Sequence, residues 1–154
     1  MKTYRIYAGG KFTESPLRLE VRAKYSNEII AHTWFADEGI LDRSIEEALR
    51  VRPVCAGLSS YEKERILLKI AEGIHARKKE FTNMLCLESA KPYRYSHVEV
   101  ERAIHVFRIA AEECKRSPKE YISLDWSENG KGKEGLVKYF PVGVVAGISP
   151  FNFP

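Results

Sequence analysis

The stretch Gly135–Pro154, GLVKYFPVGVVAGISPFNFP, decides the fold. Its middle part, Val142 to Ile148, is a nearly unbroken apolar run with two glycines, which is typical of a strand buried on both faces of a sheet. The following residues, Ser149 to Pro154, include two prolines that hold the backbone extended, which predicts a stiff loop carrying Asn152. Because open α/β sheets bind ligands at the carboxyl ends of their strands, we expect this loop to lie at a ligand site.

Two patterns in this stretch match one enzyme family. Residues 141–145 read P-V-G-V-V, against a family pattern P-x-G-V-V, and residues 150–154 read P-F-N-F-P, against P-W-N-F-P. The chain therefore resembles the aldehyde dehydrogenase superfamily. Phe151 stands in place of the usual Trp, as in some branches that act on small or phosphorylated aldehydes.

Weaker matches to the same family occur earlier in the chain. Glu88 to Pro92 reads E-S-A-K-P, similar to the family's E-x-G-K-P with Ala90 in place of glycine. Glu64-Arg65 and Glu99-Val100 also resemble family positions. The resemblance implies an α/β fold. It is the N-terminal part of an aldehyde dehydrogenase-like fold, with strand hairpins, three helices and the first strand of a doubly wound cofactor-binding sheet.

Apolar spacing independently predicts the three helices. The first covers residues 41–56, with Asp42 as its N-cap, and Pro53 predicts a kink or an early end. The second begins with a capping box formed by Ser59 and Glu62. One face of the second helix carries Ile66, Ile70, Ile74, Phe81 and Leu85. The third helix follows Pro92 and is expected to close at Pro118.

Alternating apolar and β-favouring residues predict strands on both sides of these helices. The expected strands are 3–8, 11–13, 17–21, 28–35, 121–126 and 136–140. The first two form a hairpin around Gly9-Gly10. The family resemblance further implies that the chain divides into three parts. Residues 1–118 form the hairpin and helical part of the cofactor-binding domain, residues 119–141 an outlying hairpin of the oligomerisation type, and residues 142–154 the first core strand and the start of the active-site loop.

The bulk composition is that of an ordinary globular protein. The 154 residues are 44% hydrophobic and 30% charged, and 25 basic residues are interleaved with 21 acidic ones. The net charge of +4 therefore forms no stripe, and we expect neither nucleic acid nor a membrane as a partner. The N-terminus has no apolar signal segment, and the three cysteines are widely spaced, so a cytoplasmic, reducing location is expected.

Other tempting patterns are interpreted as structural. Residues 130–135 match G-x-G-x-x-G, but a polar stretch precedes them and a strand follows, so we expect a hairpin loop. The four histidines and three cysteines lack metal-ligand spacing, so no metal site is expected. Cys55 and Cys114 are expected to be buried on apolar helix faces and Cys86 to lie among leucines, which makes all three structural.

The resemblance implies roles for the residues of the C-terminal loop. Asn152 would donate its side-chain amide to the oxyanion that forms when a cysteine thiolate attacks the aldehyde, although an asparagine here can also simply hydrogen-bond a turn. The backbone around four residues would wall the nicotinamide half of an NAD or NADP pocket, namely Ile148, Ser149, Pro150 and Phe151. Phe153 would face the aldehyde channel.

The cysteine nucleophile, the general base and the ribose-binding lysine of such enzymes would lie beyond the position of Pro154. The chain is therefore expected to be an N-terminal fragment of an NAD(P)-dependent aldehyde dehydrogenase, inactive alone and unable to bind the cofactor tightly. We expect it to self-associate or to bind a complementing C-terminal polypeptide. The alternative is a non-catalytic interaction or assembly protein derived from a dehydrogenase half.

Overall fold

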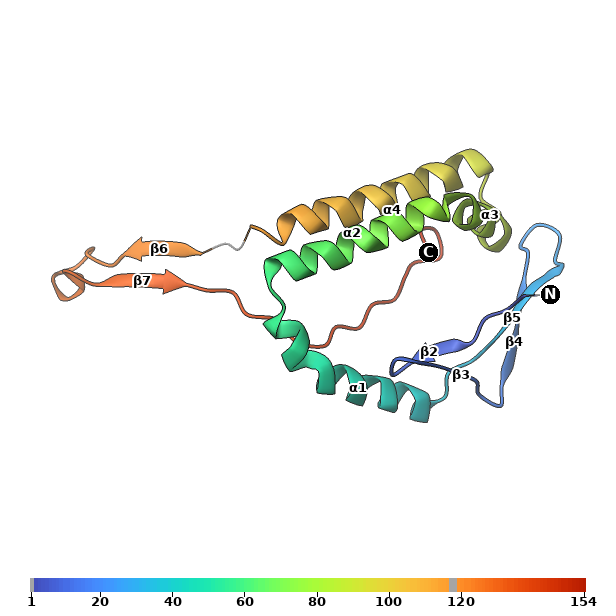
Figure 1. The fold of residues 1–154 in the computed structure, drawn as a ribbon, viewed down its shortest axis with the longest axis horizontal. Coiled ribbons are helices and arrows are strands. Elements are labelled where there is room, and N and C mark those ends of the chain that lie inside the picture. The colour runs from blue at the N-terminus through green and yellow to red at the C-terminus, as the bar shows by residue number, and fades with distance from the viewer. Residues whose placement is uncertain (1, 117–118) are drawn as a thin grey trace.

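The computed structural model describes residues 2–116 and 119–154, which contain four α-helices and three small sheets (Figure 1). The N-terminal strands are β1 (Lys2–Thr3), β2 (Ile6–Ala8), β3 (Lys11–Thr13), β4 (Arg18–Arg22) and β5 (Ile29–Trp34). β5 is the middle strand of one sheet and pairs parallel with β1 and antiparallel with β4. β2 and β3 form the predicted hairpin. Its turn requires glycine, because Gly9 and Gly10 have φ values of +56° and +77°.

The first helix, α1 (Glu38–Gly57), has its N-cap five residues before the predicted cap, Asp42. The N-cap is Asp37, whose carboxylate accepts a hydrogen bond of 2.7 Å from the backbone N–H of Ile40. The early end expected at Pro53 is also wrong, because the helix continues to Gly57. Pro53 lies close enough to the C-terminus that the missing N–H removes only one bond near a fraying end.

The second predicted helix is two helices, α2 (Ser60–Ala76) and α3 (Lys78–Ser89), so the expected count of three helices is corrected to four in the described residues. The chain turns at Arg77, whose backbone φ of −105° and ψ of 16° ends α2. Its guanidinium then hydrogen-bonds Glu80 in the first turn of α3. Apolar spacing missed this break because α2 and α3 both pack against the same partner helix. Their apolar faces therefore follow one another in the sequence without an interruption.

The partner helix shared by α2 and α3 is α4 (Tyr93–Glu113), which lies alongside α2 in Figure 1. The core cluster between these helices consists of Ala71 from α2 with Val100 and Ile104 from α4. The partly buried side chains around it are Ile74, Leu85 and Phe107. Pro118, where the helix was expected to close, lies outside the described residues.

The predicted capping box is confirmed at the start of α2. The Ser59 hydroxyl accepts from the backbone N–H of Glu62, and the Glu62 carboxylate accepts from the Ser59 backbone N–H at 2.8 Å. This backbone hydrogen bond favours the ionised carboxylate and lowers the pKa of Glu62. Its stabilising effect is therefore present above the ordinary carboxyl pKa and is lost as the pH falls through the lowered value.

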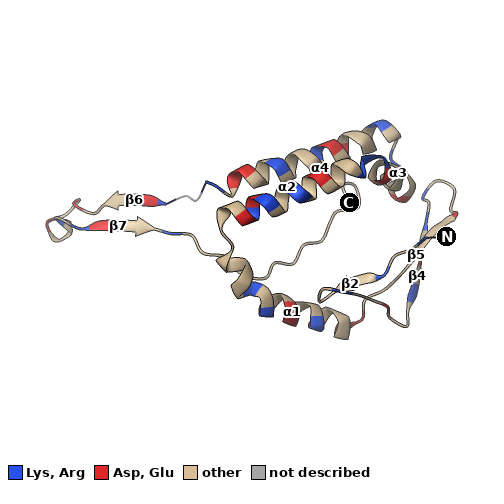
Figure 2. Ribbon diagram, in the orientation of Figure 1, with Lys and Arg blue, Asp and Glu red and all other residues tan. Residues whose placement is uncertain are grey.

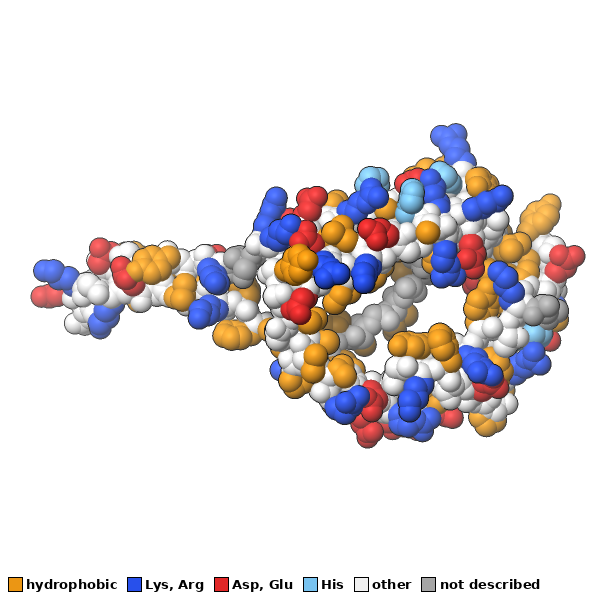
Figure 3. Space-filling view, in the orientation of Figure 1, with side chains coloured by type: hydrophobic (Ala, Val, Ile, Leu, Met, Phe, Trp, Pro, Cys, Tyr) orange, Lys and Arg blue, Asp and Glu red, His pale blue; other side chains and the backbone are white. Residues whose placement is uncertain are grey.

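A hairpin projects away from the helices (Figure 1). It consists of β6 (Glu120–Ser123) and β7 (Glu134–Val137), with Tyr121 opposite Leu136. The loop between them contains the short 3₁₀ helix η1 (Glu128–Gly130), as expected for a hairpin loop rather than a phosphate-binding loop. In Figure 3, apolar side chains lie on the outer surface of this hairpin, interspersed with charges of both signs.

The C-terminal stretch returns from the hairpin past the end of α1 to the other helices (Figure 1). The α/β fold class is confirmed, but residues 142–148 form no strand, which corrects the predicted first strand of a doubly wound sheet. A β ladder needs a partner, and within the described residues no strand pairs with this segment. Gly143 has a φ of +111°, which only glycine adopts easily.

The cysteines are less buried than predicted. Cys55 is exposed on α1, so its predicted burial is wrong, and Cys86 and Cys114 are half-buried. The reason is that Ile40 is the buried residue of α1, whose other apolar side chains, including Leu49 and Val54, face outward. Figure 2 shows basic and acidic residues interspersed along the helices, as the interleaved charges of the sequence predict.

Candidate active site

The loop from Ser149 to Pro154 ends in a tight turn beside α4. The backbone N–H of Phe153 donates to the carbonyl of Pro150 at 3.3 Å, which closes the turn around Phe151 and Asn152. The carbonyl oxygen of Asn152 accepts a hydrogen bond of 2.7 Å from the Lys91 ammonium. The backbone of Asn152 is thus anchored while its side chain stays exposed, which leaves the amide free to donate to a ligand.

Lys91 comes from the short connection between α3 and α4. The preceding residue, Ala90, ends α3 in the left-handed conformation with φ 52° and ψ 23°, a position that glycine usually occupies. This turn directs the Lys91 side chain toward α4, where it forms an ion pair with Glu99. The exposed fractions of the two side chains are 17% and 11%, so this is the least exposed ion pair among the described residues.

Two cations lie close to the ring of Phe153. The Lys91 ammonium is 4.5 Å from its centroid and the Arg102 guanidinium carbon is 4.7 Å from it, both within the range of cation–π attraction. These groups line a cavity of 480 Å³. Its lining residues are Lys91, Tyr95, Val98, Glu99, Arg102, Asn152 and Phe153. The structure therefore brings two of the predicted site residues, Asn152 and Phe153, into one cavity.

The four predicted cofactor-contacting residues lie outside this cavity. All four are exposed: Ile148 and Ser149 lead to the turn, and Pro150 and Phe151 form its first half. The side chains of Ile148 and Phe151 are 97% and 92% exposed. Sequence reasoning missed Lys91 and Arg102 as members of the site. The E-S-A-K-P match pointed to Lys91, whereas Arg102 had no local signal, since a basic residue on a helix is usually just solvated.

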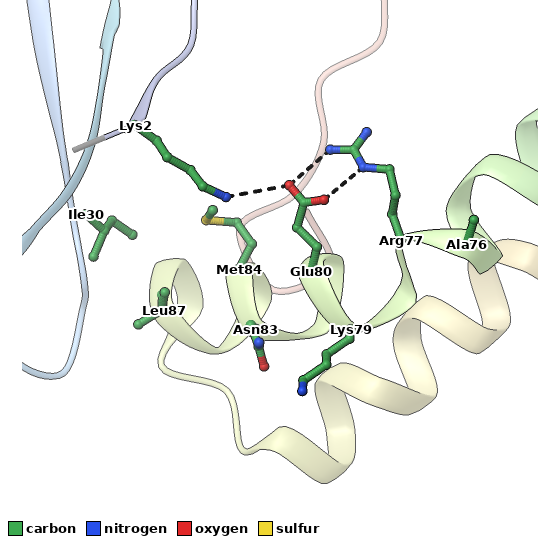
Figure 4. A pocket seen from close by; sticks show the side chains of 9 residues that line it. All are labelled: Lys2, Ile30, Ala76, Arg77, Lys79, Glu80, Asn83, Met84 and Leu87. Carbon is green, nitrogen blue, oxygen red and sulfur yellow. Dashed lines mark hydrogen bonds and ion pairs between the residues drawn. The ribbon is translucent and has the colours of Figure 1, made fainter.

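A larger cavity, of 880 Å³, lies elsewhere, between β5 and α3 (Figure 4). Figure 4 shows Lys2 and Arg77 converging on Glu80, at 3.8 Å and 2.9 Å. The Arg77 hydrogen bond lowers the pKa of Glu80. The Glu80 carboxylate forms ion pairs with Lys2 and Arg77. None of the site residues predicted from the sequence lines this cavity.

No group of three or more His, Cys, Asp or Glu side chains is placed to hold a metal ion among residues 2–116 and 119–154. No helix there combines the length and apolar character needed to cross a bilayer.

Comparison with known proteins identifies the family. The sequence model described as "Aldehyde dehydrogenase family" matches residues 12–154. The 3-sulfolactaldehyde dehydrogenase of Priestia megaterium is 31% identical over 154 residues, covering 100% of this chain and 32% of that protein. The lactaldehyde dehydrogenase of Methanococcus vannielii is 35% identical over 136 residues, covering 88% of this chain and 28% of that protein.

Solved structures agree in fold. Aldehyde dehydrogenase 21 from Physcomitrella patens, in complex with its reaction product succinate, has a TM-score of 0.95 and 36% identity, covering 99% of this chain and 32% of that one. An NADP-dependent glyceraldehyde-3-phosphate dehydrogenase from Bacillus halodurans, complexed with NADP, has a TM-score of 0.93 and 26% identity, covering 99% and 33%. The chain belongs to the aldehyde dehydrogenase family and spans about a third of the length of these relatives.

Proposed function

We propose that this chain supplies the oxyanion-binding wall of the active site in an NAD(P)-dependent aldehyde dehydrogenase, which oxidises an aldehyde to a carboxylic acid through a cysteine nucleophile. The observation that carries the proposal is the anchored Asn152 turn. The backbone of Asn152 is held by Lys91, its amide is exposed, and Phe153 beside it lines a cavity. Family membership supports the reaction class.

Asn152 has a defined electrostatic role in this proposal. When a thiolate attacks the aldehyde carbon, negative charge develops on the carbonyl oxygen, and a fixed N–H donor at that position stabilises the transition state. An amide on an anchored turn suits this task because little reorganisation is needed during the reaction. Phe153 then forms part of the aldehyde channel.

The residues from Ile148 to Phe151 suit one wall of a dinucleotide pocket. Ile148, Ser149, Pro150 and Phe151 present an exposed, mainly apolar surface beside Asn152, as the flat face of a nicotinamide requires. When bound, NAD or NADP accepts the hydride from the substrate carbon. The B. halodurans relative, solved with NADP, supports this class of cofactor. One wall cannot offset the entropy lost by a bound dinucleotide, so the rest of the fold must supply the other contacts.

The three-part division belongs to the same proposal. In this proposal residues 1–118 belong to the hairpin and helical part of the cofactor-binding domain, residues 119–141 are an association hairpin, and residues 142–154 carry the start of the active-site loop. Large apolar side chains are exposed on the hairpin, for example Tyr121 at 67% and Trp126 at 79%, which favours self-association or contact with a complementing polypeptide.

The cavity beside Asn152 further supports a substrate with an anionic group. Lys91 is paired with Glu99, whereas no carboxylate of the described residues lies within ion-pair distance of Arg102. Arg102 thus leaves net positive charge in the cavity. Guanidinium groups bind planar or tetrahedral oxyanions strongly. The relatives named for 3-sulfolactaldehyde and glyceraldehyde-3-phosphate, and the one solved with succinate, are consistent with this class.

Replacing Arg102 with methionine should selectively impair anionic substrates. The test enzyme is a chimera in which residues 1–154 of this chain replace the matching segment of the P. megaterium relative. For an anionic aldehyde, kcat/KM should fall by about 10- to 100-fold, the usual cost of a lost charged hydrogen bond, while a neutral aldehyde of equal length should be unaffected. Arg108→Met, an exposed arginine on the same helix, is the control. Equal losses for both aldehydes would contradict the proposed substrate class.

The 154-residue chain alone is expected to produce no NADH or NADPH from aldehydes and to show no saturable cofactor binding at millimolar concentration. The physical reason is that it contains one wall of the pocket and none of its cysteines lies in the cavity with Asn152. Absorbance at 340 nm and calorimetry provide the measurements. Activity in the chimera together with none in the chain supports the catalytic proposal. An inactive but folded chimera would favour the alternative, a non-catalytic interaction protein.

A further inference from the structure

Lys91 makes more contacts than charge neutralisation of one carboxylate requires. An ammonium has three N–H donors. In this chain they face three partners: the Glu99 carboxylate, the Asn152 carbonyl oxygen at 2.7 Å, and the ring of Phe153, whose centroid is 4.5 Å from Nζ. Two of the three partners belong to the C-terminal turn, which is 61 residues away along the chain.

The partial burial of this pair makes its geometry important. The Lys91 and Glu99 side chains are 17% and 11% exposed, so both charges have lost much of their hydration. Such a loss is repaid only when the pair has good geometry and further hydrogen bonds. By contrast, Lys115 pairs with Glu64 while remaining 60% exposed, which is the kind of contact that contributes little. The bond to Asn152 is therefore part of what stabilises the partly buried ammonium.

We propose that Lys91 is a positioning residue that holds the turn from Pro150 to Phe153 and thereby sets the direction in which the Asn152 amide points. The backbone is restricted on both sides of Lys91, because Ala90 before it adopts the left-handed conformation and the ring of Pro92 after it fixes φ at that residue. An effect of Lys91 on catalysis depends on the role proposed for Asn152, whereas its effect on the shape of the turn does not.

The competing explanation is that Lys91 only neutralises Glu99 and that the turn would keep its shape without it. The two explanations differ when both charges are removed. A Lys91→Met/Glu99→Gln double variant has no unpaired buried charge, so the helical part regains its stability. The turn, however, still lacks the donor to Asn152 and one of the two cations beside Phe153, because only Arg102 remains.

The experiment measures hydrogen exchange at the Phe153 amide by NMR in the ¹⁵N-labelled 154-residue chain, because this N–H donates to Pro150 and reports directly on the turn. Exchange is expected to become about tenfold faster or more in Lys91→Met and in the double variant, consistent with losing a charged hydrogen bond. Lys78→Met is the matched control, since Lys78 forms an ion pair with Glu101, which lies on α4 as Glu99 does. Unchanged exchange in Lys91→Met, or recovery in the double variant, overturns the proposal.

A second measurement needs no variant and remains decisive if the variants fail to fold. The Lys91 ammonium signal of the unmodified chain should be shifted upfield by the Phe153 ring, and its protons should exchange with water more slowly than those of Lys69 on α2. A Lys91 signal indistinguishable from that of exposed lysines overturns the proposal. Neither readout involves turnover or cofactor. If the turn loosens in Lys91→Met while Asn152→Ala leaves catalysis unchanged, the positioning role stands and the proposed function falls.

Discussion

Replacing Asn152 with alanine in the chimeric enzyme is expected to lower kcat by about 100- to 1000-fold with little change in KM, which is the usual effect of removing one oxyanion donor. The reason is that the amide interacts with charge that develops only in the transition state, so substrate binding is largely unaffected. The exposed Asn152 side chain makes this loss a local one, because no packing is removed.

Steady-state NADH or NADPH formation measures the effect, with Asn83→Ala as the control because Asn83 is an exposed asparagine on α3. Thermal unfolding of each variant checks that the fold is intact. A rise in KM at constant kcat would show that Asn152 binds the ground state instead. Equal kcat values for the parent and Asn152→Ala would contradict the oxyanion role altogether.

Replacing Ile104 with alanine is expected to destabilise the 154-residue chain by about 2–5 kcal/mol, the range for large-to-small changes in a packed core. Ile104 is 1% exposed and packs with Ala71 and Val100 between α2 and α4. Because small domains are stable by only about 5–15 kcal/mol, this change removes a large part of the total. Urea unfolding followed by circular dichroism measures it.

Ile109→Ala provides the matched control, since Ile109 lies on the same helix but is 59% exposed. Its effect should stay within about 0.5 kcal/mol, as for most surface substitutions. If both variants lost the same stability, α4 would not be packed on α2 in solution as it is in the structure.

Local chemistry made most of the fold predictable from the sequence. The capping box of Ser59 and Glu62 places the start of α2 because its hydrogen bonds span three residues. The Gly9-Gly10 turn is equally local. The break at Arg77 was missed because it depends on two helices sharing one partner, which periodicity along a single sequence does not register.

Features that depend on distant partners were predicted less well. Residues 142–148 have the composition of a buried strand, yet they remain extended without a ladder because strands form only in pairs. The exposure of Cys55 has the same origin, since α1 has an apolar face with little packed against it.

The candidate site shows the same contrast. Asn152 and Phe153 were predicted from a contiguous pattern, and the structure places both at one cavity. Lys91 and Arg102 join them from positions 50 or more residues earlier, and only the folded chain reveals their contacts. Their contacts with the turn are electrostatic and join residues far apart in the sequence, so a pattern of consecutive residues does not indicate them.

The hydrogen bond between Lys91 and Asn152 also closes a chain loop of 61 residues that contains the whole β6–β7 hairpin. The entropy of closing such a loop changes slowly with its length, by about 0.6 kcal/mol for each doubling. Insertions and deletions in the hairpin during evolution would therefore hardly affect the turn that carries Asn152. The hairpin can change its length to suit whatever it contacts, while the chemistry stays in place.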